Sequence, residues 1–332
     1  MDIRDTRSLK AFAAGRLKNA REEKKIVLIY SGLVIGLAVL VTGIRLVLDL
    51  QMDQAGGLSK VGTRTILSAL QTMAPLLQSL AVMCLELGYL AAMLRVARGQ
   101  YVSPRTLKLG FDRFSLLLRC SILQGLIYAG LAIGSVYLSS MIFVISPWGQ
   151  PFMELMTPML ADVSMLNPQL VLDDAVYFQV LATMIPMLLI LLVVFCIFAL
   201  PLIYQFRMAS YIIIDKPAIS AWGALRESRQ MMRGNCLKLL KLDFSFWWYY
   251  LVLFGISLLG DGDQWLPLIG VTLPISETAA FVLFYAVYLA LTFAAYYFLR
   301  NRVEVGYALA YDAIKPEEPK DNSVVLGNIF QM

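Results

Sequence analysis

The sequence predicts an all-α protein, a polytopic transmembrane helical bundle of about six spans. Of its 332 residues, 59% are hydrophobic and 15% are charged, whereas charged residues make up about a quarter of an ordinary soluble domain. Apolar runs of 18 or more residues recur, and each is long enough to cross a hydrocarbon core of about 30 Å as a helix. Because these runs are continuous rather than alternating in polarity, helices are favoured over the strands of a β-barrel.

The apolar runs also divide the chain into three parts. A basic N-terminal arm, residues 1–25, precedes a membrane domain of residues 26–314, and a polar tail of residues 315–332 follows it. Within the membrane domain, the six spans are expected at residues 26–48, 66–94, 114–145, 176–204, 239–259 and 278–299.

The distribution of basic residues orients these spans. Lysine and arginine accumulate in the N-terminal arm and in the loops after the second and fourth spans, whereas the loops at 147–175 and 260–277 carry acidic residues and no basic ones. Short cytoplasmic loops collect Lys and Arg, so both termini are predicted to be cytoplasmic. The net charge of +5 is then explained by anionic lipid headgroups at the cytoplasmic face rather than by nucleic acid.

A short helix is predicted in the second basic loop, over residues 218–234. Ser220 is a suitable N-cap because its hydroxyl can accept a hydrogen bond from an amide of the first turn. Gly234 is a suitable C-terminal stop. The apolar residues of this helix, Trp222 among them, fall on one face. This pattern predicts a helix in the membrane interface, with the apolar face toward the acyl chains and the guanidinium groups among the lipid phosphates.

This interfacial helix has two interpretations. It is either a topological anchor, as basic interfacial helices commonly are, or a docking surface for an anionic lipid headgroup or a cytosolic protein. The candidate contact residues are Trp222, Arg226, Arg229 and Arg233.

The second span contains an acidic residue, Glu86, between two leucines. An ionised carboxylate inside a membrane costs several kcal/mol unless it is paired or faces water, so Glu86 marks a polar site. Gln124 and Tyr128 on the next span are candidate hydrogen-bond partners, and Glu86 with Gln124 forms the predicted intramembrane site. The role of Glu86 is either a structural hydrogen bond or a step in transport or proton coupling.

The sequence predicts no enzyme and no cofactor. It has no histidine, and its four cysteines are scattered singly, so neither a zinc site nor a histidine-ligated haem has ligands. Phosphate-binding loops, nucleophile elbows and zinc-protease motifs are also missing from the sequence.

One stretch resembles a known family. Residues 209–253 read ASYIIIDKPAISAWGALRESRQMMRGNCLKLLKLDFSFWWYYLVL, and they resemble the uncharacterised integral membrane proteins of Gram-positive bacteria grouped as domain-of-unknown-function family 975. The resemblance implies a bacterial plasma-membrane protein of several helices, and it implies no activity. The residues that carry it are Asp215, Pro217, Ala224, Ser228, Arg229, Met232, Gly234, Asn235, Phe244, Ser245, Phe246 and Trp248.

Two functions remain open. The first and favoured one is a non-catalytic scaffold or accessory subunit that binds lipid or protein partners or a second copy of the chain. The alternative is a transporter or permease for an apolar or amphipathic solute, with Glu86 in the pathway. A transporter should have a water-accessible cavity that reaches Glu86, whereas a scaffold should hold Glu86 by hydrogen bonds between closed helices.

Overall fold

The computed structural model consists of helices and connecting turns, with no strand among the residues that it describes. These residues are 6–19, 22–54, 61–154, 157, 174–268, 271, 274 and 276–315. The first half contains α1 (Thr6–Asn19), α2 (Glu23–Gln54), α3 (Val61–Ala97), η2 (Pro104–Lys108), α4 (Leu109–Asp112) and α5 (Phe114–Ile145). The second half contains α7 (Asp174–Val194), η3 (Phe195–Ala199), α8 (Leu200–Phe206), α9 (Ala209–Asp215), α10 (Ala221–Met232), α11 (Cys236–Ser245), α12 (Trp247–Gly260), α13 (Gly262–Leu268), α14 (Glu277–Ala295), η4 (Tyr296–Arg300) and α15 (Asn301–Ile314).

The number of apolar helices confirms a polytopic helical bundle. A sixth span is present if α11 and α12, which meet at a bend of 62°, count as one. Two spans extend further than their apolar runs indicated: the fourth continues to Asp215 and the last to Ile314. Besides this bent pair, five stretches are long and apolar enough to cross a membrane: Glu23–Leu48, Thr65–Ala97, Phe114–Ile145, Met184–Asp215 and Ala279–Ile314.

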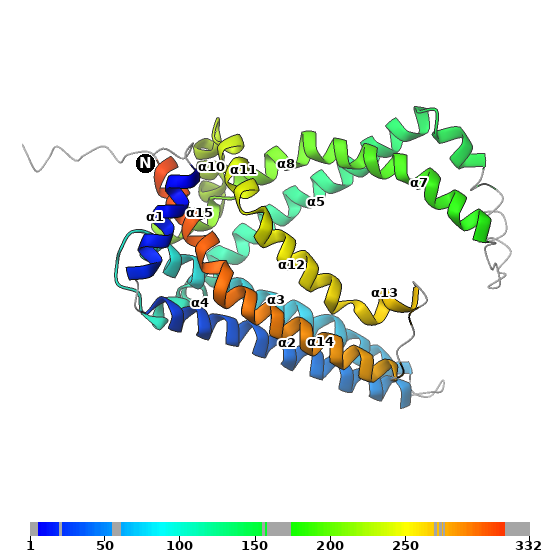
Figure 1. Ribbon diagram of the computed structural model, residues 1–332, viewed down its shortest axis with the longest axis horizontal. Coiled ribbons are helices and arrows are strands. Elements are labelled where there is room, and N and C mark those ends of the chain that lie inside the picture. Colours follow the sequence, from blue (N-terminus) through cyan, green and yellow to red (C-terminus); the bar gives the residue numbers. More distant parts are fainter. Residues whose placement is uncertain are drawn as a thin grey trace, which may run out of the picture.

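The long helices form two arms that diverge from one end of the molecule (Figure 1). One arm contains α2, α3 and α14, and the other contains α5 with α7 and α8. Helix α12 leaves the common end and packs against α14. Of the most apolar 18-residue stretch of α3, 61% is buried inside the protein, against 17% of the corresponding stretch of α5. Helix α3 is therefore the central helix of the bundle, and α5 presents most of its surface to the surroundings.

At the common end, the chain after α3 packs directly on the backbone of α3. A Cβ atom on Gly88 would lie 2.3 Å from the carbonyl oxygen of Leu107, and one on Gly110 would lie 1.9 Å from that of Cys84. No side chain fits at such distances, so glycine is required at both positions for η2 and α4 to approach α3.

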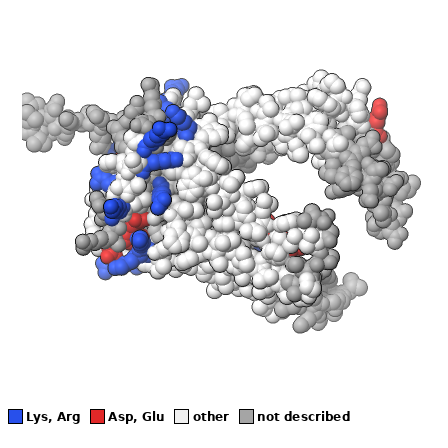
Figure 2. Space-filling view, viewed as in Figure 1, with Lys and Arg blue, Asp and Glu red and all other residues white. Residues whose placement is uncertain are grey.

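Basic side chains gather at this same end, over α1, α10 and α15, while the arms are nearly free of charge in the visible face (Figure 2). We call it the charged end. Helix α1 belongs to the predicted N-terminal arm, and it packs here against α3, α11 and α15 with Leu9 and Ala13 buried. The polar tail after Lys315 and most of the loop at 147–175 lie outside the described residues.

Helix α10 confirms the predicted short helix and corrects its surroundings. The Ser220 hydroxyl accepts a hydrogen bond of 3.0 Å from the amide of Gly223, and Gly234 has a φ of 80°. The prediction that its apolar face meets acyl chains is wrong for most of that face, because Leu225, Met231 and Met232 are buried where α10 packs against α5, α8 and α9. The apolar face of this 12-residue helix is therefore covered mainly by other helices of the protein.

Candidate functional site

Two networks of charged side chains line one cavity at the charged end. The cavity has a volume of about 370 Å³ and lies where α3, α9, α12 and α15 meet. We call it the hub cavity. Its walls are formed by Glu86, Leu90, Arg207, Met208, Ser210, Tyr211, Tyr249, Tyr250, Leu253, Tyr296, Arg300, Val303, Glu304 and Tyr307.

The first network surrounds Arg300, the last residue of η4. Its guanidinium forms an ion pair with Glu86, donates a 2.9 Å hydrogen bond to the Tyr30 hydroxyl and lies 3.6 Å from Glu304. Tyr30 in turn donates to Glu86 at 2.5 Å. The Arg300 side chain is 11% exposed, so three helices are joined by a pair of charges taken largely out of water. Breaking such a pair is strongly destabilising because one charge stays buried without its partner.

Aromatic rings enclose the same guanidinium. Its central carbon lies 4.7 Å from the ring centroid of Tyr296, 5.1 Å from that of Tyr30 and 5.2 Å from that of Tyr89. Tyr30 and Tyr89 are stacked with their centroids 4.4 Å apart. The negative faces of aromatic rings attract a cation at such distances, and more strongly where water is excluded. Three rings thereby hold the Arg300 guanidinium in place.

A π-helical turn, η4, places these residues. Tyr296–Arg300 interrupts the α-helical hydrogen bonding between α14 and α15. Such a turn contains an extra residue, so it changes the direction in which the following side chains point, and π turns are frequent at functional sites. Arg300 and Glu304 reach the cavity from this turn and from the first turn of α15.

The second network surrounds Asp243 on α11. Its carboxylate forms an ion pair with Arg207 and accepts hydrogen bonds from the hydroxyls of Tyr204 and Tyr307. Tyr307 also exchanges a 2.6 Å hydrogen bond with Tyr250. Arg207 and Tyr307 line the hub cavity, so the second arginine reaches the same space as Arg300 from the opposite arm.

A third network ties α3, α9 and α15 together beside the cavity. Arg98 binds Asp215 through two hydrogen bonds of 2.8 Å and approaches Asp312 at 2.6 Å. Lys315 lies 3.2 Å from Asp215. The hydrogen bonds that Arg98 donates to Asp215 and Asp312 hold the pKa of its guanidinium above its ordinary value. Arg98 therefore remains charged and keeps three chain segments in register.

The structure changes the predicted partners of Glu86. Glu86 is bound to Tyr30 and Arg300 rather than to Gln124 or Tyr128, and Gln124 instead donates a 3.2 Å hydrogen bond to the carbonyl oxygen of Phe206. The predicted site of Glu86 with Gln124 is therefore not assembled. Sequence reasoning overlooked Arg300 and Glu304. Their spacing of four residues at the end of an apolar span was a signal for a helical ion pair.

A comparison with known families identifies the family of this chain. The family model described as "Protein of unknown function (DUF975)" matches residues 4–301. The chain belongs to this family. No curated protein and no solved structure matches it.

Several residues of the stretch that resembles DUF975 have structural tasks at the charged end. Asp215 holds Arg98, Ser228 donates a 2.8 Å hydrogen bond to the carbonyl oxygen of Gln205, and Gly234 ends α10 with a positive φ. Phe246 stands at the bend between α11 and α12 and packs edge-on against Tyr307 at 6.1 Å. In this DUF975 protein, the stretch joins α9 through α12 to the networks around the hub cavity.

The residues predicted on α10 also meet a hollow of the surface. A pocket of about 330 Å³ is lined by Phe206, Trp222, Leu225, Arg226 and Arg229. Trp222 is 64% exposed. Arg233 is exposed as well, but it does not line this pocket. Three of the four predicted contact residues therefore lie together.

Proposed function

We propose that this DUF975 protein is a multi-pass protein of the bacterial plasma membrane that binds an amphipathic solute in the hub cavity and moves it across the membrane as a permease. The observation that carries the proposal is that Glu86, an acidic residue of a membrane span, lines an open cavity. Its side chain is 32% exposed. A cavity that reaches Glu86 is the feature that separates a transporter from a closed scaffold.

The chemistry of the cavity walls favours a solute with a polar head and little net charge. Two arginines, Arg207 and Arg300, are matched by two carboxylates, Glu86 and Glu304, so the walls attract neither anions nor cations strongly. Tyrosine rings supply apolar surface together with hydroxyl groups. Tyr211 lines the cavity, and its buried hydroxyl has no hydrogen-bond partner among the described residues.

Orientation follows from charge. The charged end carries the basic loops, so we place this end, with both termini, in the cytoplasm. The hub cavity then opens near the cytoplasmic face. We assign no catalytic role to the hub cavity, because the chain has no histidine and each carboxylate that lines the cavity already faces an arginine.

A scaffold that binds lipid or protein partners is the second candidate. It is favoured by the way Glu86 is held between α2, α3 and η4 by Tyr30 and Arg300. Exposed Arg226, Arg229 and Arg233 on α10 would then contact anionic headgroups or a cytosolic partner. This function needs no water in the hub cavity.

Thiol labelling separates the two candidates. Ser210 lines the hub cavity, and replacing it with the nearly isosteric cysteine leaves both charged networks intact. With the four native cysteines replaced, a small hydrophilic thiol reagent should label Ser210→Cys from the cytoplasmic side of intact membrane vesicles.

Ser139→Cys is the matched control, because Ser139 is buried in α5 away from the cavity. It should remain unlabelled. If a stable, correctly inserted Ser210→Cys variant reacts no faster than Ser139→Cys, the permease proposal fails and the scaffold takes its place.

A further inference from the structure

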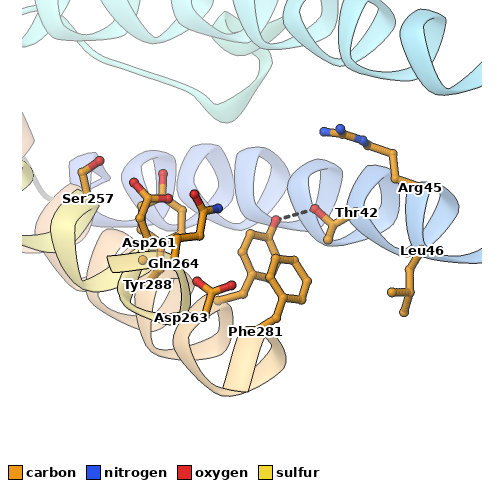
Figure 3. Close-up of a pocket in the computed structure, with 11 residues that line it drawn as sticks. Thr42, Arg45, Leu46, Ser257, Asp261, Asp263, Gln264, Phe281 and Tyr288 are labelled. Carbon is orange, nitrogen blue, oxygen red and sulfur yellow. Dashed lines mark hydrogen bonds between the residues drawn. The ribbon is translucent and has the colours of Figure 1, made fainter. Parts of the chain in front are cut away.

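A second polar cavity lies in the arm of α2, α3 and α14, at the end of this arm that is remote from the charged end. Figure 3 shows this distal cavity, which has a volume of about 550 Å³ and lies between α2, the junction of α12 with α13, and α14. Such a volume is typical of small-molecule sites. It is lined by Thr42, Arg45, Leu46, Ser257, Gly260, Asp261, Asp263, Gln264, Phe281, Tyr285 and Tyr288.

One wall of the distal cavity is aromatic. Phe281 and Tyr285 are stacked with centroids 5.7 Å apart, and Tyr285 and Tyr288 with centroids 6.1 Å apart. Thr42 on α2 shares a 2.7 Å hydrogen bond with the Tyr285 hydroxyl, drawn as a dashed line in Figure 3. This bond fixes the central ring and closes one side of the cavity against α2.

The acidic residues of the distal cavity differ from those of the hub cavity. Within the described part of the chain, no ion pair or side-chain hydrogen bond involves Asp261 or Asp263, whereas Glu86 and Glu304 both face Arg300. Two carboxylates beside aromatic faces form a favourable site for an ammonium group, which gains ionic hydrogen bonds and cation–π attraction together. Arg45, on the α2 side, can bind a phosphate or carboxylate. A zwitterion matches both.

The two cavities share the same pair of helices. On α12, Leu253 lines the hub cavity and Ser257 the distal cavity. On α14 and η4, Tyr288 lines the distal cavity and Tyr296 the hub cavity, two helical turns or about 12 Å along the axis.

Thr292 lies midway between these tyrosines, on the same helical face. On α12, Ile256 lies between Leu253 and Ser257 in the sequence and is buried. One buried apolar residue therefore lies between the two cavity-lining positions of α12.

We infer that the distal cavity is a second binding site for the same solute, that this solute carries a zwitterionic head, and that the α14 face through Thr292 connects the two sites. The inference rests on the proposed permease function. The ammonium group binds at Asp261 and Asp263, and the acidic group binds at Arg45.

Protection from thiol labelling tests the ligand chemistry. Ser257→Cys, in the cysteine-free protein reconstituted in phosphatidylglycerol vesicles, reports on the distal cavity. Adding soluble glycerophosphoethanolamine, or phosphatidylethanolamine in the bilayer, should slow its labelling. Slowing by the soluble compound identifies a free zwitterion, and slowing by the lipid alone identifies a lipid headgroup.

The acidic pair supplies the control for this measurement. Asp261→Asn with Asp263→Asn should weaken the protection at least about tenfold, because charge-assisted hydrogen bonds are lost, with the rate in unprotected vesicles unchanged. Equal labelling with and without both zwitterions would overturn the ligand assignment.

A matched pair of cysteine variants tests the connection between the two sites. Thr292→Cys should react with a small hydrophilic reagent, whereas Ala290→Cys, at nearly the same depth but on the exposed outer face of α14, should not. If Ser210→Cys is labelled and Thr292→Cys is as inert as Ala290→Cys, the connection is overturned while the hub cavity stands. If Ser210→Cys is itself inert, the proposed function fails first.

Discussion

The charged end and the α5–α7 arm are both helical, but different forces hold them. At the charged end, arginines pair with carboxylates from distant parts of the chain: Arg300 and Glu86 are 214 residues apart in sequence, and so are Arg98 and Asp312. In α5, a Cβ added to Gly125, Gly130 or Gly134 would meet nothing within 4 Å. Specific polar contacts therefore hold the charged end, whereas the arm depends on the length and hydrophobicity of its helices.

The largest effect is expected from Arg300→Met. It leaves Glu86 and Glu304 without their cation, and breaking a buried ion pair costs about 3–5 kcal/mol. The melting temperature of the detergent-solubilised protein should fall sharply, whereas Arg302→Met, on the exposed neighbouring position, should change it little.

Rescue checks the cause of that loss. Glu86→Gln with Glu304→Gln, added to Arg300→Met, removes the uncompensated charges and should restore much of the stability. A triple variant as unstable as Arg300→Met would show that packing of the guanidinium, not its charge, holds the charged end together.

Two glycine substitutions are expected to change the stability in opposite directions, and each by less than Arg300→Met. Gly110→Ala forces a Cβ against the Cys84 carbonyl, and overpacking of this kind costs about 1–3 kcal/mol. Gly125→Ala in α5 meets open space and should be neutral or stabilise the helix by up to about 1 kcal/mol. Thermal melting of both variants measures the difference in sign. Equal effects would mean that the two regions are packed alike.

Asp215→Asn should lower the free energy of unfolding by about 2 kcal/mol, because it weakens charge-assisted hydrogen bonds from Arg98 and an ion pair with Lys315. Denaturation in mild detergent measures it. Asp112→Asn, at an exposed position, serves as the control. A loss no greater than that of the control would remove the third network from the account of the charged end.

The smallest effect is expected from Glu227→Gln on α10. Glu227 pairs with Lys216 at 2.7 Å, and the two side chains are 24% and 43% exposed. Solvated pairs of this kind contribute about 0–1 kcal/mol, and added salt should erase the difference between wild type and variant. A loss comparable to that of Asp215→Asn would contradict the division between buried and exposed ion pairs.

Sequence reasoning succeeded where the signal is local. The apolar runs identified the spans, and Ser220 and Gly234 marked the ends of α10, because a cap forms within one turn of its own helix. It failed where the partner is remote. Gln124 is close to Glu86 in the predicted order of spans, yet Tyr30 and Arg300 bind Glu86 from the first and last spans.

The sequence by itself determined that this protein is a helical membrane bundle with basic loops at one end, because bilayer thickness and backbone hydrogen bonding leave few alternatives for long apolar runs. The tertiary structure alone decided which charges meet, which face of α10 is covered by protein, and where cavities remain. Those outcomes depend on contacts between residues far apart in the chain, and each apolar or polar residue has many candidate partners until the helices are packed.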